Sequence, residues 1–169
     1  MEYQAKEQNA HTCYSVDAAT AFETYSDMVY RLAFVRTGNQ ADADDILSEV
    51  FLRLVKNIRK IESEEHLKSW LIRVTIICSY SFFTGIKRRQ ESPLSDCTAS
   101  VLLEQNEVLP TVLKLPNNQK TIIYMYYFEG YSVAEISKLC SIPVGTVKSR
   151  LSRARETLKK ELKGANFDV

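Results

Sequence analysis

The chain has 169 residues, 45% apolar and 25% charged, and a formal net charge of +1. It can therefore form one domain or two small ones, and its total charge by itself is neutral evidence on a nucleic-acid partner. Four dispersed cysteines form no CxxC pair and are accompanied by only two histidines, which favours reduced thiols and argues against a metal site or other cofactor. The sequence has no long apolar run and begins with polar residues, so we expect no membrane insertion, no signal peptide and a cytoplasmic location.

Three stretches of helical periodicity occupy the first half of the chain. Residues 1–16 are polar and aperiodic, which predicts a disordered tail. The spacing of apolar residues predicts helices over 17–37 and 41–58, separated by a Gly-Asn pair that suits a helix C-terminus. A third helix is expected from about residue 66 toward a basic cluster. The positions expected to face the core are Phe22, Tyr25, Val29, Leu32 and Ala33, then Ile46, Leu47, Val50, Phe51, Leu54, Val55 and Ile58, then Trp70, Leu71, Val74, Ile77 and Cys78.

A polar stretch divides the chain into two parts. Residues 91–103 contain Pro93 with several serines and threonines and have no apolar period, which predicts a flexible linker. We therefore expect an all-α protein of two small helical domains, over 17–90 and 104–165. The second domain needs helices over 101–113 and 117–128, the latter opened by a Leu-Pro-Asn stop and cap. The end of that helix, from residue 124, also has strand propensity.

The last third of the chain predicts a helix-turn-helix. Ser132 precedes Glu135 by three positions, a capping-box arrangement that begins a helix. The segment 141–143 ends this helix with a proline, and the chain restarts at Gly145 and Thr146. An apolar stripe of period 3.6 then runs through the second helix. Its members are Val147, Leu151, Ala154, Leu158 and Leu162, and Ile142 and Val147 are expected to pin the two helices together.

The polar face of this second helix is basic at its start. Arginine can bind guanine edges bidentately in the major groove, while serine and lysine reach base edges or phosphates. The first turns of the second helix are the part that enters the groove in such motifs. A solvated charged face on an ordinary amphipathic helix is the alternative. The candidate DNA-binding residues are Thr146, Lys148, Ser149, Arg150, Ser152 and Arg153.

The same segment carries a family pattern. The string LPNNQKTIIYMYYFEGYSVAEISKLCSIPVGTVKSRLSRARETLKKEL resembles the C-terminal DNA-binding domain of bacterial RNA polymerase sigma factors. The resemblance is closest to the short extracytoplasmic-function group, with its LP-x-x-x-R start and its GTVKSRL-x-RAR helix. This resemblance implies that the basic helix reads the −35 element of a promoter as duplex DNA.

The front half carries a second, matching resemblance. The segments MVYRLAFVRTGNQADADDILSEVFLRLVKNI and LKSWLIRVTI resemble the sigma domain that grips core polymerase and reads the −10 element. The resemblance implies that Asp45, Ser48 and Glu49 contact the clamp helices of the largest polymerase subunit, with Ser48 replacing the usual glutamine. Asp42 and Asp44 need no partner, because carboxylates in a first turn are stabilised by the helix dipole.

The expected −10 surface departs from the family pattern. Relatives commonly carry an asparagine just after the Trp-Leu-x-Arg segment, whereas this chain has IICSYS over 76–81. We therefore expect an unusual −10 preference or weak promoter melting. Aromatic rings stack on unpaired bases and lysines follow phosphates, although Trp70 also lies on the apolar stripe. The candidate −10 residues are Lys68, Ser69, Trp70, Arg73, Lys87, Arg88 and Arg89.

The resemblance implies a sigma factor, a non-enzymatic subunit whose partners are core RNA polymerase and promoter DNA. It also implies an anti-sigma factor that masks both domains. The residues alone leave a stand-alone helix-turn-helix regulator open, which would bind paired half-sites without polymerase. An enzyme is the third class, but the sequence contains no nucleophile with its base and no phosphate loop.

Overall fold

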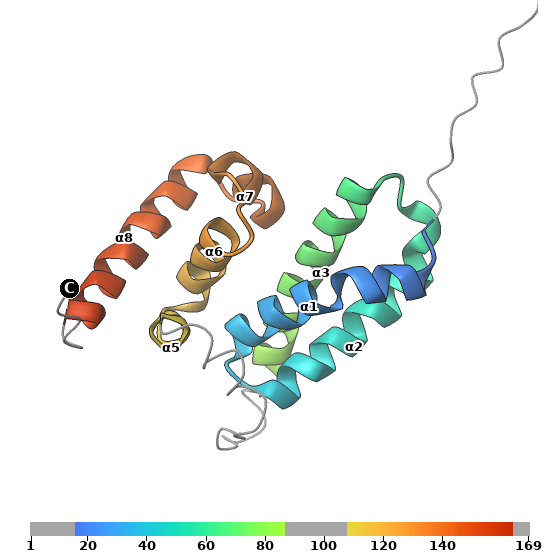
Figure 1. The fold of residues 1–169 in the computed structure, drawn as a ribbon, viewed down its shortest axis with the longest axis horizontal. Helices are drawn as coiled ribbons and strands as arrows, with labels where there is room; N and C mark the ends of the chain where they lie inside the picture. Colours follow the sequence, from blue (N-terminus) through green and yellow to red (C-terminus); the bar gives the residue numbers. More distant parts are fainter. Residues whose placement is uncertain (1–15, 87–107, 164–169) are drawn as a thin grey trace, which may run out of the picture.

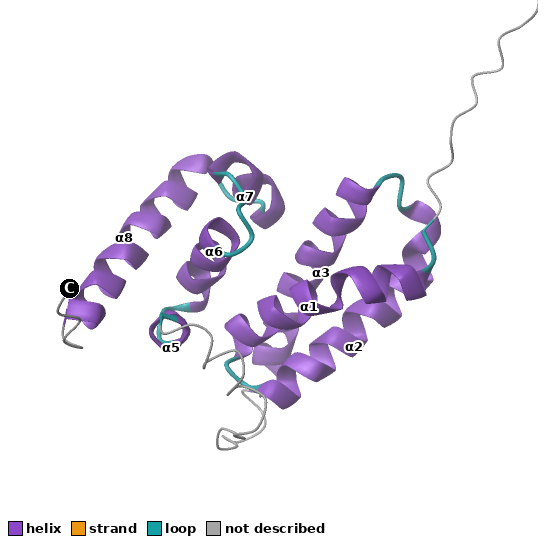
Figure 2. Cartoon of the chain, in the orientation of Figure 1, coloured by secondary structure: helices purple, strands orange, loops and turns teal. Residues whose placement is uncertain are grey.

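The computed structural model describes residues 16–86 and 108–163, without the side chains of 82–86 and 163. All regular elements in these two ranges are helical (Figure 2), which confirms the predicted all-α class. The predicted linker over 91–103 and all but the last residue of the predicted tail over 1–16 lie outside the described residues. The exact domain boundaries therefore stay predictions.

The N-terminal unit consists of three long helices and one short turn of 3₁₀ helix. Helices α1 (Ala18–Thr37), α2 (Gln40–Asn57) and α3 (Glu64–Ile86) pack on one another, and η1 (Ile58–Lys60) follows α2. The apolar faces of the three helices meet in one core (Figure 1). The buried residues of this core are Ala21, Val29, Ala33, Phe34, Ala43, Ile46, Val50, Phe51, Leu54, Ile61, Leu67, Leu71 and Cys78.

Capping residues determine where α1 and α2 begin and end. The Asp17 carboxylate accepts a hydrogen bond from the Thr20 amide at 2.9 Å, which satisfies one of the free donors of the first turn. Gly38 ends α1 in the left-handed conformation, with φ of 70°, where a side chain would be strained. Asn39 then caps α2 by accepting from the Asp42 amide. The pair ends α1 as the sequence predicts, whereas Asn39 adopts an extended conformation and begins the next helix, a role that the sequence analysis did not assign to it.

Three residues predicted for the core of this unit are exposed instead. Phe22, Val55 and Ile77 have 46%, 57% and 47% of their surface accessible. The apolar stripe on each helix is wider than the strip that two neighbouring helices can cover, so its edge faces outward. Phe22 still contacts the core, because its ring meets that of Phe51 edge-on with the centroids 4.9 Å apart.

The C-terminal unit contains four helices. They are α5 (Leu109–Leu113), α6 (Asn117–Tyr127), α7 (Val133–Cys140) and α8 (Val144–Lys163). The predicted start of α5 near residue 101 lies outside the described residues. The segment with strand propensity is helical from Tyr124 to Tyr127, where α6 ends, and Tyr124 and Met125 are buried in the core of this unit. At buried positions, packing against neighbouring elements can outweigh the local propensity for a strand.

The cap of α6 lies within the predicted Leu-Pro-Asn stretch. Pro116 is the residue before the first turn, and no side chain caps it. The Pro116 carbonyl instead accepts from the amides of Gln119 and Lys120, at 2.8 and 3.0 Å. Proline suits this place because its ring restricts φ and it has no amide that needs a partner.

The two units pack against each other. Helix α6 contacts α1, and α7 contacts α3, so α6 and α7 lie alongside the N-terminal unit (Figure 1). Leu32, Val35 and Ile72 of the N-terminal unit belong to the same buried cluster as the core of the C-terminal unit. The predicted flexible linker did not imply any contact between the two units.

Candidate nucleic-acid and polymerase interfaces

The turn between α7 and α8 is held by hydrogen bonds at both ends of α7. At its start the Glu135 amide donates to the Ser132 hydroxyl, and the Ser132 amide donates to the Glu135 carboxylate at 2.8 Å. This capping box, which the sequence predicts, lowers the pKa of Glu135. At its end Ser141 adopts the left-handed conformation with φ of 54°, and the Ser137 hydroxyl donates to the Ile142 carbonyl at 2.6 Å. The entry angle of α8 is therefore fixed.

The apolar side of α8 anchors it to the rest of the C-terminal unit. The helix begins at Val144, one residue before the predicted restart, and the Pro143 carbonyl accepts from the amides of Thr146 and Val147. Val147 is fully buried and Ile142 half-buried, so both pack where the sequence predicts the pins of the turn. Leu151 and Ala154 are buried as well. This burial orients the opposite face of α8 toward solvent.

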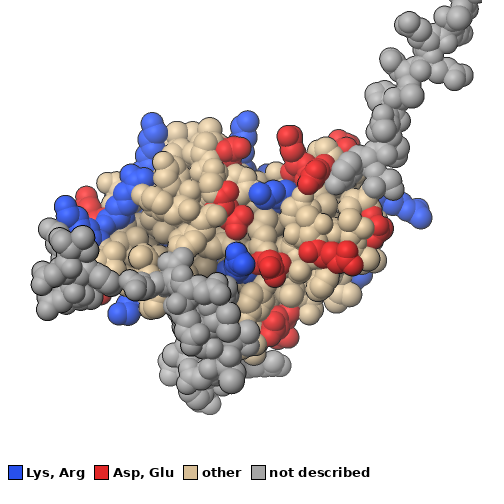
Figure 3. All heavy atoms as spheres, viewed as in Figure 1, with Lys and Arg blue, Asp and Glu red and all other residues tan. Residues whose placement is uncertain are grey.

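The outward face of α8 presents the predicted DNA-binding residues. Lys148, Ser149, Ser152 and Arg153 are exposed, whereas Thr146 and Arg150 are half-buried. Lysine and arginine side chains follow the outer edge of the molecule over α8, at the left of Figure 3. Among the described residues the ion pairs join Asp27 to Arg31 and Glu49 to Arg53, and neither involves α8. The cations of α8 are thus available to a polyanion.

Arg155 is an exception on this helix. Its Nε donates to the Tyr127 hydroxyl at 2.7 Å, and its guanidinium carbon lies 5.5 Å from the ring centroids of Tyr126 and Tyr127. The residue is therefore held against α6 and acts in packing, since an arginine plane stacks favourably on aromatic rings. The tandem tyrosines of α6 are the sequence signal for this contact.

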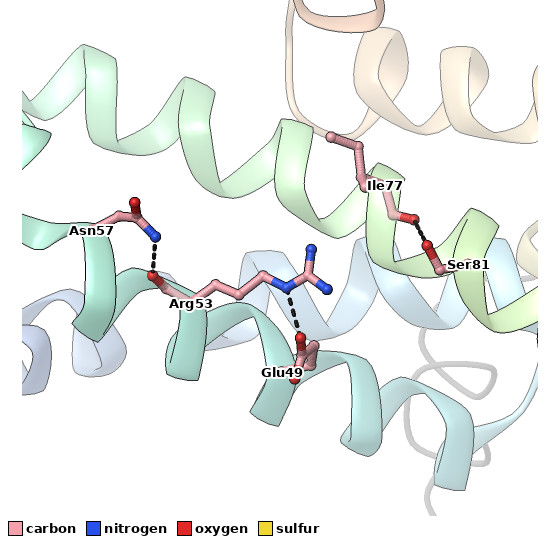
Figure 4. A network of polar contacts seen from close by, with 5 residues as sticks. All are labelled: Glu49, Arg53, Asn57, Ile77 and Ser81. Carbon is pink, nitrogen blue, oxygen red and sulfur yellow. Dashed lines mark hydrogen bonds and ion pairs between the residues drawn. The ribbon is translucent and has the colours of Figure 1, made fainter.

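The predicted polymerase-binding residues lie together on α2. Asp45, Ser48 and Glu49 are all exposed, at spacings that share one helix face. Glu49 is also the partner of Arg53 within the same helix, with 2.6 Å between Oε1 and Nε (Figure 4). The helix begins at Gln40, so of the two aspartates expected in its first turn, Asp42 lies there and Asp44 does not. Burial, with Asp45 nearby, raises the pKa of Asp42.

The candidate −10 residues on α3 adjoin the C-terminal unit. Lys68 lies with its Nζ 5.1 Å from the ring centroid of Tyr131. Arg73 is exposed, and its Nη2 donates to the Lys138 carbonyl at 3.4 Å. Trp70 is half-buried and packs on the core of the N-terminal unit, beside the half-buried Ser69. Lys87, Arg88 and Arg89 lie outside the described residues.

The departure from the family pattern over 76–81 has a structural counterpart. Cys78 and Ser79 are buried, and the Ser79 hydroxyl donates to the Thr75 carbonyl one turn earlier. Ile77 and Ser81 are exposed, and the Ser81 hydroxyl donates to the Ile77 carbonyl beside α2 (Figure 4). The hydroxyls of Ser79 and Ser81 are therefore directed to the backbone of α3 itself.

Arg36, which lies outside every predicted site, is only 1% exposed. Its Nη1 donates to the Thr121 hydroxyl at 2.5 Å, and its guanidinium carbon lies 4.6 Å from the Tyr80 ring centroid. The residue joins the two units. An arginine inside an otherwise apolar run, AFVRTG, indicates that this side chain is buried and paired with a polar group.

Within residues 16–86 and 108–163, none of the helices combines the length and the apolar character of a membrane span. No group of three or more histidine, cysteine, aspartate or glutamate residues there could hold a metal ion.

Comparison with known proteins identifies the two units. The family described as Sigma-70 region 2 matches residues 21–89, and Sigma-70, region 4 matches residues 106–158. The ECF RNA polymerase sigma factor SigW of Bacillus subtilis is 29% identical over 168 residues, covering 86% of this chain and 88% of SigW. The ECF sigma factor EcfG of Rhodopseudomonas palustris is 32% identical over 132 residues, covering 72% of each chain.

Solved structures share the fold. The sigma factor RpoE of Bartonella quintana, in complex with the anti-sigma factor NepR, superposes with a TM-score of 0.70 at 20% identity, covering 86% of this chain and 96% of RpoE. CnrH, in complex with the cytosolic domain of CnrY, gives a TM-score of 0.67 at 18% identity, covering 88% of this chain and 89% of CnrH. The chain belongs to the extracytoplasmic-function group of sigma-70 RNA polymerase sigma factors, non-enzymatic subunits that direct transcription initiation through regions 2 and 4.

Proposed function

We propose that α8 reads the −35 element as duplex DNA while the N-terminal unit binds polymerase through α2 and the −10 strand through α3. The observation that carries this proposal is the outward face of α8, the second helix of a helix-turn-helix, whose cations have no carboxylate partner among the described residues. Its opposite face is buried from Val147 to Ala154. A helix anchored in this way can enter a major groove without rearrangement.

The residues of α8 divide into two roles. Arg150 and Arg153 are the candidates for bidentate contact with guanine, because the fork of a guanidinium matches the two acceptors of that base. Lys148, Ser149 and Ser152 are exposed beside them and suit phosphate oxygens, which position the helix without reading sequence. Thr146 lies in the first turn of α8, and its carbonyl accepts a hydrogen bond from the Ser149 hydroxyl at 3.0 Å.

The acidic face of α2 is the proposed contact with core polymerase. Asp45 and Ser48 are exposed beside Glu49, whose ion pair with Arg53 holds one carboxylate oxygen. An acidic helix face suits a basic partner helix, where complementary charge speeds association and sets orientation. Asp45 is therefore the principal contact in this proposal, with Ser48 and Glu49 beside it.

The proposal extends to control and location. RpoE is bound to the anti-sigma factor NepR in its solved structure, and CnrH is bound to the cytosolic domain of CnrY. We infer that a protein of the anti-sigma kind also binds this chain and covers its polymerase and DNA surfaces. Since polymerase and chromosome share one compartment in bacteria, the chain would act in the cytoplasm.

Run-off transcription with purified core polymerase tests the proposal. Templates drawn from the source genome are transcribed with and without the protein, and transcript starts are mapped. New starts sharing upstream sequence elements are expected with the wild-type chain and not with a variant in which Arg150 and Arg153 are both alanine. Identical transcripts with and without the wild-type protein would contradict the proposed function.

A further inference from the structure

Val144, the first residue of α8, is the exposed apolar side chain of the helix-turn-helix. It keeps 42% of its surface accessible, whereas every other valine, leucine and isoleucine described from 132 to 162 is buried or half-buried. Val147, three positions later, is fully buried and packs α8 against the rest of the unit. The packing of the two helices therefore leaves much of Val144 in water.

The side chain of Val144 projects beyond the start of α8. In a helix the Cα–Cβ bond tilts toward the N-terminus, and no turn of α8 precedes Val144, because the helix begins there. Lys148 lies one turn later on the same flank and is exposed too. Val144 is therefore at the end of α8 that enters the major groove in helix-turn-helix proteins, next to a cation.

Gly145, the next residue, has an identity that the fold itself does not require. The positive φ that favours glycine is adopted by Gly38 and Gly130 but not by Gly145. A Cβ at Gly145 would meet no atom within 4 Å outside its chain neighbours and the backbone of α8. Glycine in a helix costs stability relative to alanine, and it is used for positive φ or where the backbone closely approaches a ligand. Gly145 is exposed, so the second use applies to it.

The apolar group that a major groove offers to such a surface is the methyl group of thymine. Among the groups at the base edges there, the 5-methyl of thymine is apolar, and small apolar side chains contact it. Lys148, Arg150 and Arg153 are donors that suit base acceptors and phosphates, so they leave this methyl group unread. Val144 supplies the apolar contact that these three residues lack.

We propose that Val144 contacts the 5-methyl group of a thymine in the −35 element, and that Gly145 lacks a side chain because DNA approaches the backbone of α8 there. This inference rests on the proposed function of α8 and adds to its base reading a residue outside the predicted set. Val144 then selects one A·T pair in a fixed orientation, because only one strand of that pair carries the methyl group.

Replacing thymine by deoxyuridine, which lacks the 5-methyl group, tests the contact. A promoter found by the run-off assay is made with one such replacement at a time across the −35 element. Polymerase carrying the wild-type chain or Val144→Ala is titrated onto each duplex, with circular dichroism to check folding. At one position we expect deoxyuridine to weaken wild-type binding about fourfold, the effect of one methyl group withdrawn from water. Val144→Ala should bind the two duplexes equally at that position.

Val108→Ala is the matched control. It shortens the same type of residue at a comparable exposure of 37%, just before α5, and should keep the wild-type response to every deoxyuridine. Two results would overturn the contact. One is an equal response of the wild type and Val144→Ala at every thymine, and the other is a −35 element without any A·T pair.

Gly145→Ala tests the approach of DNA to the helix backbone by two readouts of opposite sign. Alanine favours a helix more than glycine does, so the midpoint of urea denaturation should rise, while promoter binding should weaken because the added methyl group displaces the DNA. Promoter binding as tight as that of the wild type would overturn the approach. A lower midpoint would also overturn it, by showing that Gly145 serves the fold.

Failure of this inference and failure of the proposed function give different results. The proposed function fails if the wild-type chain produces no new transcript starts in the run-off assay. The inference alone fails if new starts appear and depend on Arg150 and Arg153, but Val144→Ala changes the response to deoxyuridine at no position.

Discussion

At the scale of single residues, the turn before α8 contains a local strain. Ser141 has φ of 54°, a conformation that costs most L residues roughly 1–2 kcal/mol. Its amide bonds the Lys138 carbonyl at 3.3 Å, which terminates α7 in the manner that usually recruits glycine. The strain persists because Ser137 and Ile142 fix the backbone on either side through two further hydrogen bonds.

Replacing Ser141 by glycine should stabilise the protein. Glycine adopts positive φ without a steric cost, and its greater freedom in the unfolded chain offsets part of the gain, so we expect about 0.5–1 kcal/mol in the free energy of unfolding. Urea denaturation at pH 7 measures it. Ser152→Gly, at an exposed position inside α8, is the control and should destabilise by about 0.5 kcal/mol. A loss of stability in Ser141→Gly would show that the strain is absent.

Arg150 offers a residue-scale test of base reading. If its guanidinium contacts a base, Arg150→Ala should weaken polymerase-dependent promoter binding by about 1–3 kcal/mol and relax selectivity at one −35 position. Arg155→Ala is the matched control, because Arg155 is held by Tyr127 and should leave selectivity unchanged. Competition binding against promoters with single −35 substitutions measures both variants. A uniform loss over all promoters would make Arg150 a phosphate contact.

At the scale of elements, each helix has one face for packing and another for partners. Helix α8 buries Val147 and Leu151 and exposes its cations, while α2 buries Ile46 and Val50 and exposes its carboxylates. Both patterns follow from a period of 3.6 residues, which separates the two faces. The partner faces of α2 and α8 are therefore rigid surfaces whose orientation the cores determine.

Reversing one charge on α2 tests the polymerase contact. Asp45→Arg should weaken capture of core polymerase because it places like charge against a basic partner helix. Asp44→Arg is the control, since Asp44 is exposed on the same helix but lies outside the predicted contact. Capture on immobilised core polymerase, with circular dichroism to check folding, distinguishes the two. Equal capture of the two variants would remove Asp45 from the interface.

At the scale of the whole molecule, the buried Lys120 beside the contact between the two units is expected to make stability depend on pH. Its pKa is lowered from 10.5 to about 8 in the folded chain, so between these values the unfolded chain binds more protons than the folded one. Stability therefore rises with pH through this range, and the cost of the buried charge is fully present below about pH 7. Arg36 on α1 is the charge that lies near Lys120 across the contact between the two units.

We expect the wild type to gain about 1 kcal/mol in free energy of unfolding between pH 7 and pH 9 from this one group. Urea denaturation at the two pH values, with Lys120→Met as the comparison, measures it. The variant should be more stable than the wild type at pH 7 and should lack the rise. The same rise in both proteins would assign it to other groups.

Much of this molecule follows from local pattern. Caps and periodicity depend on neighbours within one or two turns, so they can be predicted from the local sequence. Examples are the capping box at Ser132 and Glu135, the end of α1 at the Gly-Asn pair, and the apolar stripe on α8. The edges of the stripes were less predictable. Phe22, Val55 and Ile77 are exposed because the width of a buried face depends on how many helices cover it.

The sequence by itself determined the helices, the helix-turn-helix and the family, since each is encoded in residues that are close along the chain. Only the tertiary structure decided which faces the two units bury against each other. Arg36 and Thr121 are 85 positions apart, and nothing around either residue specifies the other. Such a contact depends on the shape and charge of two assembled surfaces, and those surfaces exist only once both units have folded.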